Sequence, residues 1–117
     1  MIDGFFRIAF TGVAGSGFGL LVFQNGSVAG VDVAGATYDG SYAENPKTAE
    51  VSIQVTMAAS AGITPVQTGV PLAAPISVPI SVTLTQADTS GEKPVLLQTS
   101  LGPVNVIFKK IRDLPGA

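Results

Sequence analysis

The chain is 117 residues long, its formal net charge is −2, and 12% of its residues are charged. A chain of this length folds around one core, so we expect a single domain over residues 1–117 with a frayed tail at 113–117. Histidine and cysteine are both absent. Their absence excludes a Ser-His-Asp or Cys-His nucleophile, a disulfide framework and the usual zinc site.

The charged residues do not form the pattern of a nucleic-acid-binding protein. The eight acidic residues are scattered singly, and the one basic cluster is Lys109, Lys110 and Arg112. In an alternating strand Lys109 and Lys110 face opposite ways, so we interpret this cluster as a solvated strand edge. We therefore predict no nucleic-acid partner.

The sequence also lacks the signals of a membrane or secreted protein. No apolar segment approaches the roughly 20 residues of a membrane-spanning helix, and no basic segment precedes the first apolar stretch. Together with the absence of cysteine, this predicts a cytoplasmic protein that does not contact a membrane. We expect no cofactor and no bound metal.

Alternation of apolar and polar residues is frequent, whereas helix signals are almost absent. Such segments predict eight short strands, at residues 5–11, 18–24, 27–33, 36–43, 51–57, 76–85, 95–99 and 104–111. Most connections between them look like hairpins. We therefore expect an all-β fold, a small antiparallel up-and-down β-barrel of roughly eight strands.

Glycines punctuate the first third of the chain. Residues 12–17 predict a loose turn, and Asn25-Gly26 predicts a type I′ hairpin because both residues tolerate a positive φ. The segment between them, 18–24, is apolar on both faces. A strand of this kind is covered on both sides, so we expect the core on one side and another surface on the other.

Prolines mark the later part of the chain. Residues 58–75 contain three prolines and form the longest irregular stretch, a length that is usually functional or mobile. Pro79 lies within an otherwise regular strand. Since proline cannot donate to a ladder, we expect that strand at an edge or at a breach in the barrel.

The glycines at 12 and 17 are spaced as in a phosphate-binding loop. That loop continues with Lys and then Ser or Thr, whereas this chain continues with Phe18 and Gly19, and no helix follows. We interpret the segment as a hairpin loop.

Asp32 and Asp39 are the candidates for an acid–base pair, because they lie on neighbouring predicted strands. The alternative is a structural aspartate at a strand end, with Asp32 pointing inward at Tyr38, Tyr42 or Arg7. The alternative is favoured, and we predict that the protein is not an enzyme.

Four segments resemble the GrlR-like family, small bacterial proteins named for a negative regulator of type III secretion genes. These segments are Asp3–Phe10, Gly17–Gly26, Gly30–Asp32 and Tyr38–Gly40. The likeness covers residues 3–57, and the remainder is similar by strand pattern alone.

The resemblance implies a lipocalin-like barrel of eight strands with an apolar interior, found as a homodimer. It also implies that a protein partner, a transcriptional activator, contacts an acidic loop after the Tyr-x-Gly strand. The matching residues here are Glu44, Lys47 and Glu50, so a lysine accompanies the two carboxylates.

The first functional hypothesis is therefore a non-enzymatic, homodimeric β-barrel that acts as a negative regulator by binding a protein. Its dimer or partner surface is predicted at Leu21, Phe23 and Pro79, in the doubly apolar strand and the proline-bearing strand.

The alternative hypothesis is a carrier of a small apolar or amphipathic ligand, because an eight-stranded barrel has room for side chains or for one such ligand. The residues predicted to line its interior are Phe6, Phe10, Phe18, Tyr38, Tyr42 and Phe108. The competing explanation, that these rings simply pack the core, is favoured.

Overall fold

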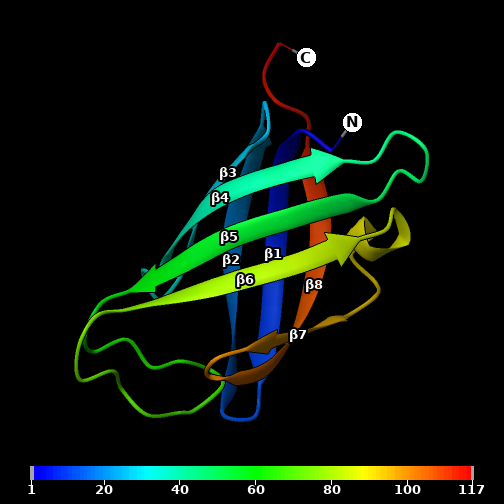
Figure 1. Ribbon diagram of the computed structural model, residues 1–117. Helices are drawn as coiled ribbons and strands as arrows, with labels where there is room; N and C mark the ends of the chain where they lie inside the picture. Colours follow the sequence, from blue (N-terminus) through cyan, green and yellow to red (C-terminus); the bar gives the residue numbers. More distant parts are fainter. Residues whose placement is uncertain (1, 117) are drawn as a thin grey trace.

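The computed structural model describes residues 2–116, which form an all-β fold (Figure 1). Its strands are β1 (Gly4–Gly12), β2 (Gly15–Gln24), β3 (Ser27–Asp32), β4 (Thr37–Glu44), β5 (Val51–Ala59), β6 (Ile76–Leu84), β7 (Val95–Thr99) and β8 (Gly102–Arg112). One 3-10 turn, η1 (Ala87–Thr89), lies between β6 and β7. The predicted fold class is confirmed.

The strands form one antiparallel sheet in the order β6-β5-β4-β3-β2-β1-β8-β7. Strands that follow each other in the chain pair as hairpins, except β6 and β7, which do not pair, and β1 also pairs with β8. The first and last strands of the order, β6 and β7, contact each other. The sheet is therefore a nearly closed up-and-down barrel with a seam between β6 and β7 (Figure 1).

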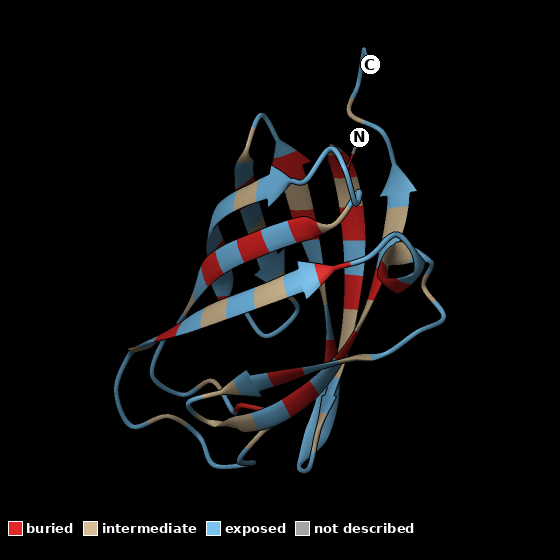
Figure 2. Ribbon diagram, turned by 45° about the vertical axis from the view of Figure 1, so that its right-hand side comes forward, coloured by how far each residue is buried: buried red, intermediate tan, exposed pale blue. Residues whose placement is uncertain are grey.

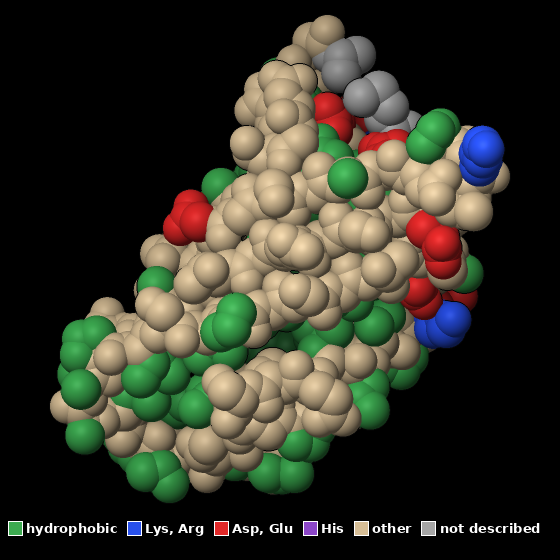
Figure 3. Space-filling model, in the orientation of Figure 1, with side chains coloured by type: hydrophobic (Ala, Val, Ile, Leu, Met, Phe, Trp, Pro, Cys, Tyr) green, Lys and Arg blue, Asp and Glu red, His purple; other side chains and the backbone are tan. Residues whose placement is uncertain are grey.

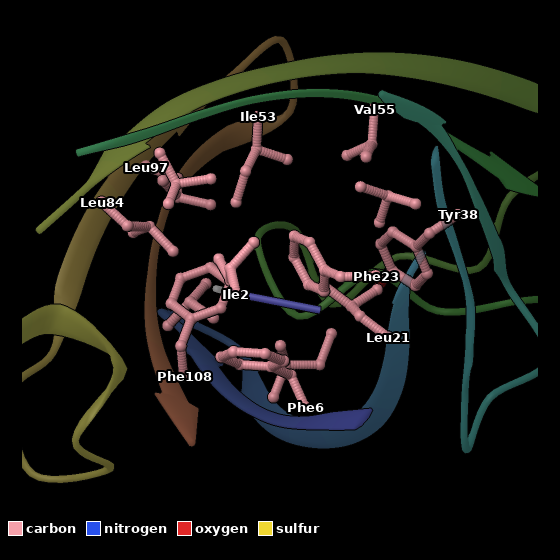
Figure 4. Close-up of a cluster of buried hydrophobic side chains, with 14 of the residues drawn as sticks. Ile2, Phe6, Leu21, Phe23, Tyr38, Ile53, Val55, Leu84, Leu97 and Phe108 are labelled. Atoms are coloured by element: carbon pink, nitrogen blue, oxygen red, sulfur yellow. The ribbon is translucent and has the colours of Figure 1, made fainter. Parts of the chain in front are cut away.

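Burial alternates along the strands, as Figure 2 shows by its bands of colour. Successive side chains of a strand point to opposite faces, so one residue in two faces the interior. The buried core draws on all eight strands and the N-terminal segment: Ile2, Phe6, Ile8, Leu21, Phe23, Val28, Tyr38, Val51, Ile53, Val55, Leu84, Leu97, Val104, Val106 and Phe108 (Figure 4).

Aromatic rings fill one end of the barrel, which we call the closed end. The ring centroids of Phe6 and Phe23 are 4.9 Å apart, and those of Phe23 and Tyr42 are 5.2 Å apart. Phe6 and Phe23 are the largest fully buried side chains among the described residues. This end carries the Asn25-Gly26 hairpin, whose two residues have the positive φ expected of a type I′ turn, 52° and 82°.

The prediction of a loose turn at residues 12–17 is wrong. β1 and β2 remain paired up to Gly12 and Gly15, so only Val13 and Ala14 form the turn. The two-residue connection fixes the register of the hairpin, in which Phe10 lies opposite Gly17.

Pro79 lies where its chemistry predicts, in the middle of the edge strand β6. The pairing of β6 with β5 continues unbroken through the Thr56–Pro79 pair. A proline fits there because its missing N–H is on the side that has no neighbouring strand.

The turn η1 follows β6 and packs against both β6 and β8. Its buried Asp88 accepts a hydrogen bond from the backbone N–H of Thr85 at 2.8 Å and pairs with Lys93 at 3.2 Å. The Thr85 backbone bond is the main reason why the pKa of Asp88 lies below its ordinary value.

A substitution at Gly40, in the middle of β4, would test how closely β4 and β5 pack. A Cβ at this position would overlap the carbonyl oxygen of Gln54 in β5. We expect Gly40→Ala to lower the free energy of unfolding by about 2–3 kcal/mol, because the β4–β5 backbones must separate. Urea denaturation measures this loss, and Ser41→Ala, at the neighbouring exposed position, is the control. A loss for Gly40→Ala no larger than that of the control contradicts the expectation.

Candidate functional site

The end opposite the aromatic cluster, which we call the mouth, contains an apolar cavity of about 170 Å³. All eight strands contribute inward-facing side chains to its wall. Small side chains, among them Val55 and Ala59, occupy inward positions in the wall of this cavity. The interior of the barrel is therefore filled at one end and hollow at the other.

The irregular segment 60–75 covers the mouth. Its ends are held together by the last β5–β6 pair, Ala59 and Ile76. The carbonyl oxygen of Val66 accepts a hydrogen bond from the Ala14 N–H at 2.9 Å. The Gln67 Nε2 donates to the Thr99 Oγ1 at 3.4 Å, so the segment is attached to both the β1–β2 and β7–β8 hairpins.

Ile63, Pro65 and Val66 turn their side chains toward the cavity and form part of its wall. The segment is thus an Ω-loop whose ends lie together and whose own apolar side chains complete a site. We call it the mouth loop. Its length is the signal in the sequence that predicts a functional or mobile segment, whereas nothing in the sequence indicates that it covers a cavity.

The seam in the barrel wall gives the cavity a second boundary. In Figure 3, hydrophobic side chains lie at the bottom of a hollow just below β6, which runs diagonally across this face. The half-buried Ile80 and Val82 of β6 face Leu97 of β7 across the cavity. Because no ladder joins β6 to β7, this part of the wall consists of side chains alone.

Two glycines of the first hairpin allow the mouth to pack closely. A Cβ at Gly12 would overlap the backbone of Val66 in the mouth loop, and a Cβ at Gly17 would lie 2.6 Å from the ring of Phe10. These glycines are therefore required for close approach rather than for a turn, and neither belongs to a phosphate site.

Asp32 lies at the cavity wall, at the end of β3. Its Oδ1 accepts hydrogen bonds from the N–H groups of Ala34 and Ala36, at 3.0 Å and 3.1 Å. Its Oδ2 accepts a hydrogen bond from the Tyr38 hydroxyl at 2.8 Å. The carboxylate thereby fixes the turn between β3 and β4, as aspartate commonly does.

The structural interpretation of Asp32 is confirmed, with Tyr38 as its partner among the three alternatives. Asp39 is exposed on the outer face of β4, whereas Tyr38 and Asp32 face inward, so the two aspartates do not form an acid–base pair. Burial and the adjacent carboxylate both raise the pKa of Tyr38, which keeps its hydroxyl a neutral donor.

Five of the six aromatic residues predicted for the interior do face it. Phe10, Tyr38 and Phe108 line the cavity, whereas Phe6 and Tyr42 belong to the packed closed end. The Tyr42 hydroxyl donates a hydrogen bond to the Asp3 carboxylate. Burial, followed by this hydrogen bond, raises the pKa of Tyr42 to about 12.

The prediction for Phe18 is wrong, because this side chain lies on the outer face of the barrel and is 56% exposed. Phe18 lies opposite Ala9 of β1, and directly opposed residues share a face. Ala9 alternates with the inward-facing Ile8 and Phe10. A two-residue turn therefore places Phe18 outside.

The same register overturns the prediction that Leu21 and Phe23 form a dimer or partner surface. Both point into the barrel (Figure 4), with exposures of 5% and 0%. The outer face of β2 is instead formed by Phe18, Leu20 and Val22. Pro79, the third residue predicted for this surface, is exposed on the outer face of β6.

The candidate partner loop lies at the closed end, away from the cavity. Its ends are joined by a hydrogen bond from the Asn45 N–H to the Glu50 carbonyl oxygen at 2.8 Å. Glu44 accepts a hydrogen bond from the Ile2 N–H at 2.7 Å, and Lys47 is exposed.

Within residues 2–116, no cluster of three or more metal-ligating side chains occurs, and no helix is long and apolar enough to cross a membrane. The fold and its cavity define a small antiparallel β-barrel with an apolar pocket at one end. No family model matches the chain, and neither does any curated protein.

The two tyrosines, the only ones in the chain, should titrate above the ordinary tyrosine pKa of about 10. Between about pH 10 and 12 the unfolded chain loses phenolic protons that the folded chain retains, so stability falls as the pH rises through this range. Below about pH 10 both states keep the protons, and the contribution is constant.

The ultraviolet absorbance of tyrosinate, recorded together with circular dichroism, measures this titration. We expect the Tyr42 step near pH 12 and the Tyr38 step at higher pH or upon unfolding. Tyr38→Phe should remove the later step alone. An absorbance change of both tyrosines near the ordinary pKa in a chain that is still folded would contradict the expectation.

Proposed function

We propose that this protein binds a small apolar ligand in the cavity at the mouth of its barrel, without catalysing a reaction. The observation that supports the proposal is the cavity itself, about 170 Å³ of apolar space in an otherwise packed interior. Protein interiors are close-packed, and voids larger than a water molecule are few.

The size and chemistry of the cavity indicate what it would hold. An engineered cavity of about 150 Å³ lined by aliphatic and aromatic side chains stays dry and binds benzene. The cavity here is of similar size and is lined largely by Ile, Val, Leu and Phe side chains. A ligand with one ring, or a short alkyl chain, therefore fits.

The energetic argument points in the same direction. At about 24 cal/mol per Å³ of cavity, an empty space of this size costs about 4 kcal/mol. A ligand that fills it restores the missing contacts.

The mouth loop and the seam between β6 and β7 are the two places at which side chains, rather than paired strands, form the wall of the cavity.

Titration with ethylbenzene, followed by NMR of the backbone amides, tests this function. We expect saturable shifts at cavity residues such as Ile8 and Val106. Val82→Phe adds a ring to the wall from the half-buried face of β6 and should weaken binding by about tenfold or more. The control is Leu20→Phe on the outer face, which should leave binding unchanged. Shifts that are absent, or equally weakened by both substitutions, would contradict the proposal.

A second candidate function, a homodimeric regulator of the GrlR-like kind, is favoured by the outer face of β2 and β3. Phe18, Leu20 and Val31 are large apolar side chains that are 41% to 56% exposed there. Leu20 and Val31 lie directly opposite each other. A continuous exposed apolar patch of this kind commonly marks an interaction surface.

The rest of the barrel wall differs from this patch. The outward-facing side chains of β5 and β6 are mainly Ser, Thr and Gln, including Ser52, Gln54 and Thr83, and this wall shows few hydrophobic atoms in Figure 3. We therefore propose that the subunit or partner surface of this second function lies on β2 and β3, in place of Leu21 and Phe23.

Light scattering of the purified chain tests the second proposal. We expect a dimer at micromolar concentration, which Leu20→Lys should dissociate because it places a charge in the centre of the buried patch. Thr83→Lys, on the polar wall, is the matched control and should leave the mass unchanged. A monomer at every concentration would contradict this proposal and leave the ligand-binding proposal standing.

A further inference from the structure

The charge that the lining side chains place at the cavity is negative. Among the described residues that line it, Asp32 is the only charged side chain, and no lysine or arginine is present. Asp32 is half-buried, and neither of the ion pairs found in residues 2–116 involves it. Its charge is compensated only by hydrogen bonds from neutral groups.

The hydrogen bonds at Asp32 leave acceptor capacity for a ligand. A carboxylate offers about four lone-pair sites, and the donors in the structure are Ala34, Ala36 and Tyr38. Because these three donors hold the carboxylate in place, a cationic donor would meet a preorganised acceptor at the edge of an apolar space.

We propose that the cavity selects small apolar amines, with the ammonium group at Asp32 and the hydrocarbon body among the Ile, Val and Phe side chains. This inference rests on the proposed ligand-binding function. The same charge disfavours ligands with a carboxylate, because an anion at the mouth would meet Asp32 and no cation. The pocket is therefore not built for fatty acids or other organic anions.

Other polar side chains of the cavity wall carry no charge that would oppose this choice. Thr64, Gln67 and Thr99 also line the mouth, and all three are neutral. The basic cluster predicted from the sequence does not supply a counter-charge: Lys109 and Arg112 are exposed, and Lys110 pairs with Asp113 at 2.6 Å.

A matched series of ligands tests the inference on the unmodified chain. Phenylpropylamine, phenylpropanol and phenylpropanoate share one ring and one propyl chain and differ in head-group charge at neutral pH. We expect the amine to bind about tenfold or more tightly than the carboxylate, with the alcohol between them. Added salt should reduce the advantage of the amine, because an ion pair at a half-exposed site is screened.

Asp32→Asn removes the charge at nearly constant volume and should bring the ratio of amine to alcohol affinity close to one. Asp39→Asn removes an equal charge from the outer face of β4, away from the cavity, so it should preserve the preference for the amine. If the carboxylate binds as tightly as the amine, or if the preference survives Asp32→Asn, the inference is overturned. If ethylbenzene and all three ligands fail to bind, the proposed function itself is overturned.

Discussion

The rest of this structure depends on how the inward-facing side chains, one in two along each strand, fill the interior of a nearly closed sheet. Eight paired strands fix the volume of the interior, and alternation decides which residues share it. At one end Phe6, Phe23 and Tyr42 fill that volume with rings in tilted and edge-to-face contact. At the other end smaller side chains, such as Val55 and Ala59, do not fill the volume, and a cavity remains.

The strands and the barrel could be predicted from the sequence because their signals are local. Alternation located all eight strands, Asn25-Gly26 specified its own turn, and Pro79 indicated an edge. The assignment of faces in β2 failed for a physical reason. The turn before β2 contains two residues rather than a loose run of six, and an error of one residue in register exchanges the two faces of a strand.

The candidate site was much less predictable, because it is made by contacts distant in the chain. The pairing of Asp32 with Tyr38 has a local signal, a carboxylate at a strand end followed by a short turn. By contrast, the bond between Val66 and Ala14 joins two segments that carry no matching pattern. No local sequence pattern predicts a cavity, because its volume depends on the summed volumes of side chains from every strand.

Pro79 has a consequence for the behaviour of the chain at high concentration. Sheets with exposed edges grow by adding strands from other molecules, which leads to fibres. In this barrel the edges of the sheet are β6 and β7. Proline interrupts the row of N–H donors in the middle of β6, and the closeness of β7 leaves little room for an incoming strand. A chain in which 46% of the residues are hydrophobic is thereby protected against polymerisation through its own seam.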